Sequence, residues 1–315
     1  MITLMMKCLL CLLICTWVTL PLLQAREFTN RNGVTIEATL LGLSGDQVRL
    51  KSKGSTYTLP ISEFIEADQK HIRGWAKEQQ AAALSQQQEA AFSKHGIKPA
   101  PGFQVCTHSE AGQPDSQFHV YIPKSYDGSS KLPLIISAHG ANQKGGKEIK
   151  GWEKLADEFS CIVVAADNLS GARRVNFQEH CLPDLKKLES ILKRVKGALA
   201  IDEKKVMHSG FSAGGYLTFF SMKLDDDITH LCFRCCNYSD HLKPYVGAAS
   251  KQWKGRPIYW FYGTKDARSV LAEVDKAKAF LDASGCTLRW EKINGWSHRD
   301  DKRRAIEWLI KTPAR

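Results

Sequence analysis

A serine lies between two glycines in the segment Gly210-Phe211-Ser212-Ala213-Gly214. An apolar run precedes this segment and an apolar-rich helical pattern follows it, so the chain has to turn from a strand into a helix within five residues. So tight a turn leaves little room for side chains, which explains a glycine on either side. A serine hydroxyl held at such a turn can attack a carbonyl carbon when an adjacent base removes its proton. The spacing therefore predicts that Ser212 is a nucleophile.

An acid and a base follow this serine along the chain. Asp266 lies in the loop after the apolar run 258–262, and His298 lies in the loop after the apolar run 288–290. We expect His298 to take the proton from Ser212 and to return it to the leaving group. Asp266 would fix the imidazole tautomer and stabilise the imidazolium that forms.

Other interpretations of these residues stay open at this point. Asp266 could cap the helix that follows it, in which case Asp300, Asp301 or Asp240 would be the acid. His298 could be a surface histidine before a charged helix, although it is the only histidine downstream of Asp266.

The negative charge of an acyl-transfer intermediate needs N–H donors that are already in place. One donor is expected from the residue after the nucleophile, Ala213, and the second from Ala141 or Gly140. His139 precedes this pair, and we expect it to shape the turn. Further residues in the loops around the site are predicted to contact substrate: Asn142, Arg173, Arg174, Asn237 and Tyr238. The loops 140–152 and 168–180 also carry five basic residues, and such a rim suits hydroxylated or acidic groups better than long acyl chains.

Strands that alternate with helices are predicted to position these residues. The apolar runs lie at 118–122, 134–138, 161–166, 206–207, 231–236, 258–262 and 288–290. The helical patterns lie at 182–195, 213–222, 270–283 and 301–310. This alternation predicts an α/β fold with a mostly parallel sheet covered by helices on both faces. Ligands of such sheets bind beyond the carboxyl ends of the strands, where the candidate residues stand.

Residues 100–315 resemble the α/β-hydrolase superfamily, and within it the exported esterases related to polyhydroxybutyrate depolymerases and to feruloyl or acetylxylan esterases. The segments that carry the resemblance are YIPKSYDGSSKLPLIISAHG, IDEKKVMHSGFSAGG, FYGTKDARS and NGWSHRD. The resemblance implies hydrolysis of a carboxylic ester through an acyl-serine intermediate, without a metal or an organic cofactor. The segments CFRCCNYSDH and SGARRVNFQEHCLPD depart from the family pattern, so the acyl group and the alcohol stay open.

Ahead of this catalytic domain, assigned to residues 102–315, the chain has a different pattern. Short alternating segments separated by polar turns over residues 26–76 predict a small all-β domain. It resembles the Sla-type homology domain, an SH3-like barrel, in its opening R-x-F-T, its L-P-I-S turn and its closing D-Q-x-x-I-x-x-W. That family binds proteins or peptides, so this module is expected to bind a protein or a surface. Residues 77–101 predict a helical linker, ended by glycine and prolines.

The first 25 residues have the layout of an export signal. An early Lys7 is followed by an apolar run to about Leu23, and the run is short for a spanning helix and contains Pro21. Cys15 would suggest a lipoprotein, but Ile14 stands where a small residue is required. We therefore expect a secreted or periplasmic protein without stable membrane insertion, and lipid anchoring is the less favoured alternative.

Seven cysteines remain after removal of this signal, an odd number, so at least one thiol is free or pairs between chains. The run HLCFRCC contains a C-x-x-C, yet no second ligand pair completes a zinc site, so we interpret it as a buried strand. A disulfide among the seven stays open. Lys and Arg (44) exceed Asp and Glu (33), but no basic cluster is interleaved with aromatics, so we expect no nucleic-acid partner and no metal.

These observations predict an exported serine esterase whose substrate is an acyl or aromatic ester, possibly linked to a polysaccharide. Two alternatives remain. The first is a serine peptidase of the same fold, because the same three residues also support amide cleavage. The second is an inactive binding or adhesion protein.

Overall fold

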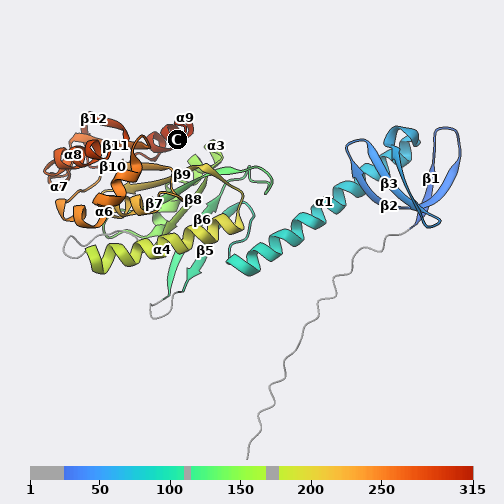
Figure 1. Cartoon of the computed structure of the whole chain (residues 1–315), viewed down its shortest axis with the longest axis horizontal. Coiled ribbons are helices and arrows are strands. Elements are labelled where there is room, and N and C mark those ends of the chain that lie inside the picture. Colours follow the sequence, from blue (N-terminus) through green and yellow to red (C-terminus); the bar gives the residue numbers. More distant parts are fainter. Residues whose placement is uncertain (1–24, 110–114, 168–176, 315) are drawn as a thin grey trace, which may run out of the picture. The chain divides into compact units, whose positions relative to one another are not determined.

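The computed structural model describes residues 25–109, 115–167 and 177–314, and the chain divides into two compact units at Ser85/Gln86 (Figure 1). Apart from Ala25, the predicted signal peptide lies outside the described residues. Within the described ranges, no helix is both long and apolar enough to cross a membrane.

The N-terminal unit contains an antiparallel sheet with the strand order β1-β2-β3-β4. Its strands are β1 (Arg26–Thr29), β2 (Thr35–Ser44), β3 (Gln47–Ser52) and β4 (Ser55–Pro60). Gly45 lies in the turn between β2 and β3, and its φ of +57° favours glycine. An all-β pattern is thus confirmed as a four-stranded antiparallel sheet.

A long helix, α1 (Glu66–His95), follows this sheet after a short 3-10 turn, η1 (Ile61–Glu63). Ile72 of α1 is fully buried in a core with Phe28, Val48 and Leu50. The helix therefore begins inside the predicted all-β domain, and it continues without a break through most of the stretch that the sequence suggested as a linker. The boundary between the two compact units, at Ser85/Gln86, lies within α1.

The C-terminal unit is built on an eight-stranded sheet with the order β12-β11-β10-β9-β7-β8-β6-β5. The strands are β5 (Gly102–His108), β6 (Ser116–Ile122), β7 (Leu132–Ala138), β8 (Ile162–Ala166), β9 (Ile201–Phe211), β10 (His230–Arg234), β11 (Pro257–Lys265) and β12 (Thr287–Ser297). The six strands from β12 to β8 are parallel, and β6 is antiparallel to both of its neighbours. The predicted mostly parallel sheet is confirmed.

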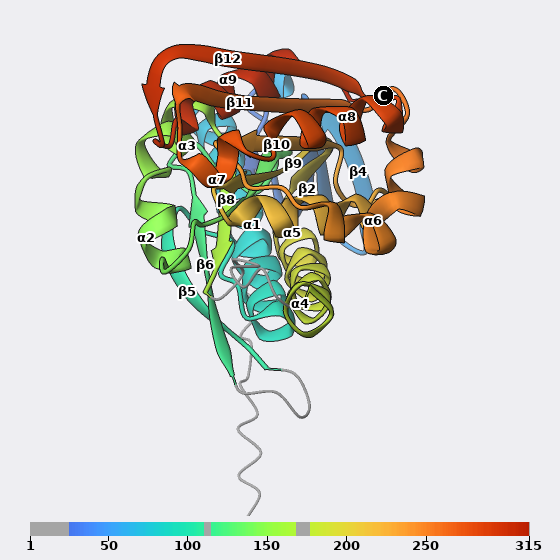
Figure 2. The ribbon, with the colours of Figure 1, turned by 90° about the vertical axis from the view of Figure 1, so that its left-hand side faces the viewer.

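Helices lie on both faces of this sheet (Figures 1 and 2). They are α2 (Gly145–Lys150), α3 (Glu153–Phe159), α4 (Phe177–Ala198), α5 (Gly214–Phe220), α6 (Lys243–Ser250), α7 (Arg268–Leu271), α8 (Val274–Ser284) and α9 (Lys302–Lys311). One buried core contains side chains of α4, α5, α6 and α8, and a second core contains side chains of α2, α3 and α9. Every residue of helix α5 is buried, because the helix is enclosed by its neighbours.

All seven cysteines of the described residues are free thiols, and six of them are buried. The segment HLCFRCC includes the fully buried strand β10. Burial raises the pKa of Cys161, Cys181 and Cys232 to about 12, so these thiols are protonated side chains of the core.

Candidate active site

The carboxyl ends of three strands in one sheet carry the residues that the sequence singles out. β9 ends at Phe211, and Ser212 is the next residue; likewise Asp266 follows the end of β11 and His298 follows the end of β12. Because β9, β11 and β12 are parallel members of one sheet, their carboxyl ends lie along the same edge. The topology alone thus brings these residues together.

Ser212 occupies a turn that tolerates little change. Its φ of +53° is unusual for a residue with a side chain, and such a conformation persists only when the surroundings enforce it. A Cβ on Gly210 would lie 2.4 Å from Thr218 Oγ1, and one on Gly214 would lie 2.5 Å from the Ala138 carbonyl oxygen. Glycine is therefore required on both sides of the serine for close packing.

The side chains of Ser212, His298 and Asp266 form a continuous hydrogen-bonded chain. His298 Nε2 lies 2.9 Å from Ser212 Oγ, and His298 Nδ1 lies 2.6 Å from Asp266 Oδ1. An ionised carboxylate can only accept, so Nδ1 carries the proton and Nε2 is left to accept one from the serine. The arrangement can move a proton from the hydroxyl to the imidazole as the oxygen attacks.

Asp266 is buried, with 7% of its surface exposed, yet it is held ionised. Burial opposes ionisation, but hydrogen bonds from His298, Cys235 and the Gly263 and Ala267 N–H groups outweigh it and lower the pKa of Asp266 below its ordinary value. The bond from Ala267 N to Oδ1 measures 2.7 Å. A carboxylate that stays charged in a buried site favours an imidazolium beside it.

The other acids considered from the sequence have different partners. Asp300 pairs with Arg234 and Lys302, and Asp301 accepts from Arg304 N at 3.1 Å as the N-cap of α9. Asp240 accepts from the Tyr238 hydroxyl at 3.1 Å and pairs with Lys243. Of the four, Asp266 is the one hydrogen-bonded to His298.

The predicted oxyanion donors belong to two segments of the chain that meet near Ser212. Ala213 is buried at the start of α5, immediately after the nucleophile. A Cβ placed on Gly140 would lie 3.5 Å from Ser212 Cβ, so the loop after β7 passes close to the serine. His139 is hydrogen-bonded through Nδ1 to the Gly140 carbonyl at 2.8 Å, and in this way it braces the turn.

The five predicted substrate contacts have different surroundings. Asn142 is exposed on the loop beyond Gly140, and Asn237 Oδ1 lies 3.5 Å from Ser212 Oγ. Tyr238 is 2% exposed and packs against Phe219 and Phe280, so the structure places its ring in the core. Two arginines of the prediction, Arg173 and Arg174, lie outside the described residues.

Parts of this chain are similar to known proteins. No family model matches it. A bifunctional acetylxylan esterase/xylanase from Neocallimastix patriciarum is 30% identical over 186 residues, which are 58% of this chain and 26% of that protein. The chain thus corresponds to about a quarter of that relative's length.

Two solved structures with a similar fold extend the comparison. An esterase from the Planctomycetes species Thermogutta terrifontis, with propionate bound, is 17% identical over 67% of this chain and 93% of its own, with a TM-score of 0.52. The chain has an α/β-hydrolase-like fold. A putative dipeptidyl aminopeptidase IV from Bacteroides ovatus is 12% identical over 91% of this chain and 42% of its own, with a TM-score of 0.53. The fold is thus shared with an esterase and with a putative peptidase.

In this α/β-hydrolase-like unit, a cysteine also approaches the acid. Possible ligand atoms of Cys235, Asp266 and His298 all lie within 4.8 Å of one another, a spacing that a metal ion could use. Burial and the neighbouring Asp266 raise the pKa of the Cys235 thiol to about 12, whereas a metal needs the thiolate. His298 Nδ1 and Asp266 Oδ1 already share a proton, and His298 Nε2 and Asp266 Oδ2 have Ser212 Oγ and Gly263 N as their partners. This group therefore suits proton transfer better than metal binding.

Several side chains at the site make contacts that the sequence did not indicate. Phe211 stacks on the His298 ring with centroids 5.0 Å apart, and Asn237 Nδ2 donates to Ser269 Oγ at 3.0 Å. Arg234 is fully buried beneath the site. An arginine inside the apolar run LCFRCC was the one available sign, because a buried charge has to be paired.

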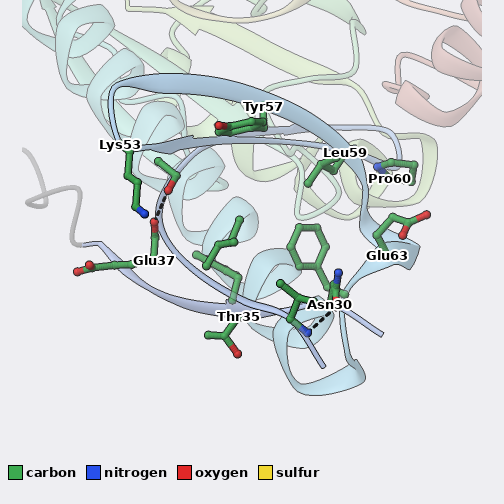
Figure 3. A pocket seen from close by; sticks show the side chains of 13 residues that line it. Asn30, Thr35, Glu37, Lys53, Tyr57, Leu59, Pro60 and Glu63 are labelled. Carbon is green, nitrogen blue, oxygen red and sulfur yellow. Dashed lines mark hydrogen bonds between the residues drawn. The ribbon is translucent and has the colours of Figure 1, made fainter. Parts of the chain in front are cut away.

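The N-terminal unit has a pocket of its own, with a volume of about 740 Å³ (Figure 3). Strands β2 and β4 face one another across it, with Thr35 and Glu37 opposite Tyr57 and Leu59. Its lining is completed by Phe28, Asn30, Val34, Ile36, Ser52, Lys53, Pro60, Glu63 and Phe64. Tyr57 is 46% exposed, so an aromatic surface is open to a ligand.

Proposed function

We propose that the chain is a serine esterase that cleaves carboxylic esters through a Ser212–His298–Asp266 triad and an acyl-enzyme. The observation that carries this proposal is the pair of hydrogen bonds, 2.9 Å and 2.6 Å long, that connect the serine to the acid through the imidazole. The acetylxylan esterase relative and the esterase of the same fold support it.

The proposed reaction uses each group at one stated atom. Ser212 Oγ attacks the ester carbon while His298 Nε2 takes its proton, and Asp266 stabilises the imidazolium. The imidazolium then protonates the departing alcohol oxygen, and a water molecule repeats the sequence to release the acid. The N–H of Ala213 and that of Gly140 or Ala141 stabilise the oxyanion in both steps.

The proposed substrate is an acyl or aromatic ester on a carbohydrate. The relative's name includes an acetylated xylan as its substrate, which supports a short acyl group. Exposed Asn142 and Lys144 on the loop after β7, and exposed Lys147 in α2, provide polar and positive groups that suit hydroxylated or acidic alcohols. A lipase would instead need a broad apolar surface here.

Comparing hydrolysis across substrate classes tests this function. We expect kcat/KM to be highest for acetyl or feruloyl esters, lower for C12 to C16 esters, and undetectable for peptide amides, with Ser212→Ala as the blank. Cleavage of peptide amides alone would favour the peptidase alternative. No hydrolysis of any ester or amide would leave the inactive binding protein.

We further propose that the protein is exported and that its N-terminal unit binds a protein or a surface. The apolar leader supports export, and the pocket beside Tyr57 supports binding. In the full chain, Tyr57→Ala should weaken attachment to a polymeric substrate while kcat for a soluble ester stays within about twofold. If the natural protein and Tyr57→Ala attached equally well to the polymer, this role of the pocket would be contradicted.

A further inference from the structure

The loop that carries His298 has no regular structure of its own. Residues 298–301 lie between β12 and α9 without strand or helix hydrogen bonding. A base on such a loop needs other contacts to hold it within reach of Ser212, because a displacement of about 1 Å can reduce a rate by about a hundredfold.

Arg234, the last residue of β10, is buried completely and reaches this loop with one end of its guanidinium. Its Nη1 donates to the Asp300 carboxylate, two residues beyond His298. Its Nη2 donates to Glu148 Oε1 at 2.9 Å and to Ser137 Oγ at 3.0 Å. The guanidinium thus connects the His298 loop to α2 and β7 in the middle of the fold.

Arg234 belongs to a group of four charged side chains that pair with one another. We call this group the Arg234 network, and its members are Arg234, Lys302, Glu148 and Asp300. Lys302 Nζ pairs with Asp300 and lies 3.2 Å from Glu148 Oε1. Two positive and two negative side chains leave no net charge. Trp152 Nε1 donates to Ser137 Oγ at 2.9 Å and covers the network from the side.

The same arginine also touches the other half of the site. Its carbonyl oxygen accepts from Ser212 N at 3.1 Å, and its guanidinium faces the Phe211 ring at 6.0 Å. Phe211 in turn stacks on His298. One residue therefore contacts the backbone of the nucleophile and, through Asp300, the loop of the base.

We infer that Arg234 and Asp300 are positioning residues, whose ion pair holds the His298 loop at the distance from Ser212 that proton transfer requires. This inference rests on the proposed esterase function. Stability alone does not explain the network, because well-packed apolar side chains serve a core as well as a buried ion pair does. A planar, multiply bonded guanidinium fixes geometry in a way that apolar contacts do not.

The test cuts the contact while keeping the charges balanced. Asp300→Ala with Lys302→Met removes one charge of each sign, so Arg234 keeps a single counter-charge in Glu148. We expect kcat to fall by about 10- to 100-fold with KM within about twofold. Asp300→Asn with Lys302→Met keeps an oxygen that can accept from Arg234, and it should recover most of kcat.

The matched control is Asp301→Ala, which removes the neighbouring carboxylate of the same loop. It costs α9 its N-cap, so it should lower Tm by a few degrees and leave kcat unchanged. The inference is overturned if the charge-balanced alanine variant keeps the kcat of the natural protein, or if kcat falls in proportion to Tm in all variants.

A second measurement separates this inference from the esterase proposal. The proton between His298 Nδ1 and Asp266 gives a proton NMR signal that does not depend on any substrate. It should be present in the natural protein and in Asp301→Ala, and lost or weakened in the charge-balanced alanine variant. If the natural protein hydrolyses no ester, the proposed function fails, while an unchanged signal in the alanine variant overturns the positioning role by itself.

Discussion

The two halves of the candidate site are held in place by different means. Around Ser212 the backbone does this: a positive φ and glycines at 210 and 214 leave no space for another arrangement. Around His298 the loop backbone is irregular, and side chains from distant elements hold it, above all Arg234 through Asp300. A backbone-built turn tolerates few residue types, whereas a loop held by side chains can be anchored in many ways.

The largest loss of activity is expected when the side chain of either Ser212 or His298 is removed. Ser212→Ala and His298→Ala should each lower kcat by about 10⁴- to 10⁶-fold, and the double variant should lose no more than either one. His298 is partly exposed and Ser212 fills no core space, so Tm should change little. Steady-state kinetics of the three variants measure this, and additive losses would show that the two residues do not act as a unit.

A substitution in the half of the site around Ser212, which the backbone holds in place, should lower the stability of the protein. Gly214→Ala places a methyl group 2.5 Å from the Ala138 carbonyl oxygen and 2.9 Å from that of His139, and neither backbone can move aside. We expect the free energy of unfolding to fall by about 3 kcal/mol. Gly247→Ala is the matched control, since its methyl group meets nothing within 4 Å in α6. Equal urea midpoints of the two variants would contradict the close packing.

In the half of the site around His298, which side chains hold in place, the contribution to stability should instead depend on pH. Burial opposes ionisation of Glu148, but Arg234 and Lys302 outweigh it and hold its pKa at about 2, below the ordinary 4.5. The group thus stabilises the fold above pH 4.5, and this contribution is lost as pH falls towards 2. Glu148→Gln should lower stability at pH 7 by about 3 kcal/mol and approach the natural protein in acid. Parallel Tm curves from pH 7 to 3 would contradict it.

The smallest effect is expected where the two halves touch. Phe211→Leu keeps an apolar side chain but removes the ring that stacks on His298. Such a ring pair contributes about 0.5–1.5 kcal/mol, so kcat should fall by about two- to tenfold with an unchanged KM. Tm should hardly move, because Phe211 is only half-buried. A hundredfold loss would make Phe211 a main support of the base.

The same contrast explains what the sequence could predict. Ser212, Asp266 and His298 were predicted because each follows an apolar strand at the carboxyl edge, and the mostly parallel sheet followed from the alternation of strands and helices. Strand β5 gave no clear signal, because it is an edge strand that leaves Phe103 and Val105 exposed. Helix α2 opens with two glycines, which propensity disfavours, yet a Cβ at Gly145 would lie 2.7 Å from the Ala165 carbonyl oxygen.

Contacts between side chains far apart along the chain could not be predicted from the sequence. Asp300 stood among the possible acids, and only the fold shows that Arg234, 66 positions earlier, is its partner. Tyr238 was expected at the substrate because it follows β10, but its ring turns into the core beside Phe219. No local pattern says to which side of a loop a side chain points.

Labelling with a fluorophosphonate, followed by peptide mapping, tests the central claim most directly, because the reagent bonds to a serine that a base has activated. The account predicts a single modified residue, Ser212, in the natural protein, and no labelling at that position in His298→Ala. Modification of another residue, or labelling of Ser212 at the same rate after His298→Ala, would contradict it.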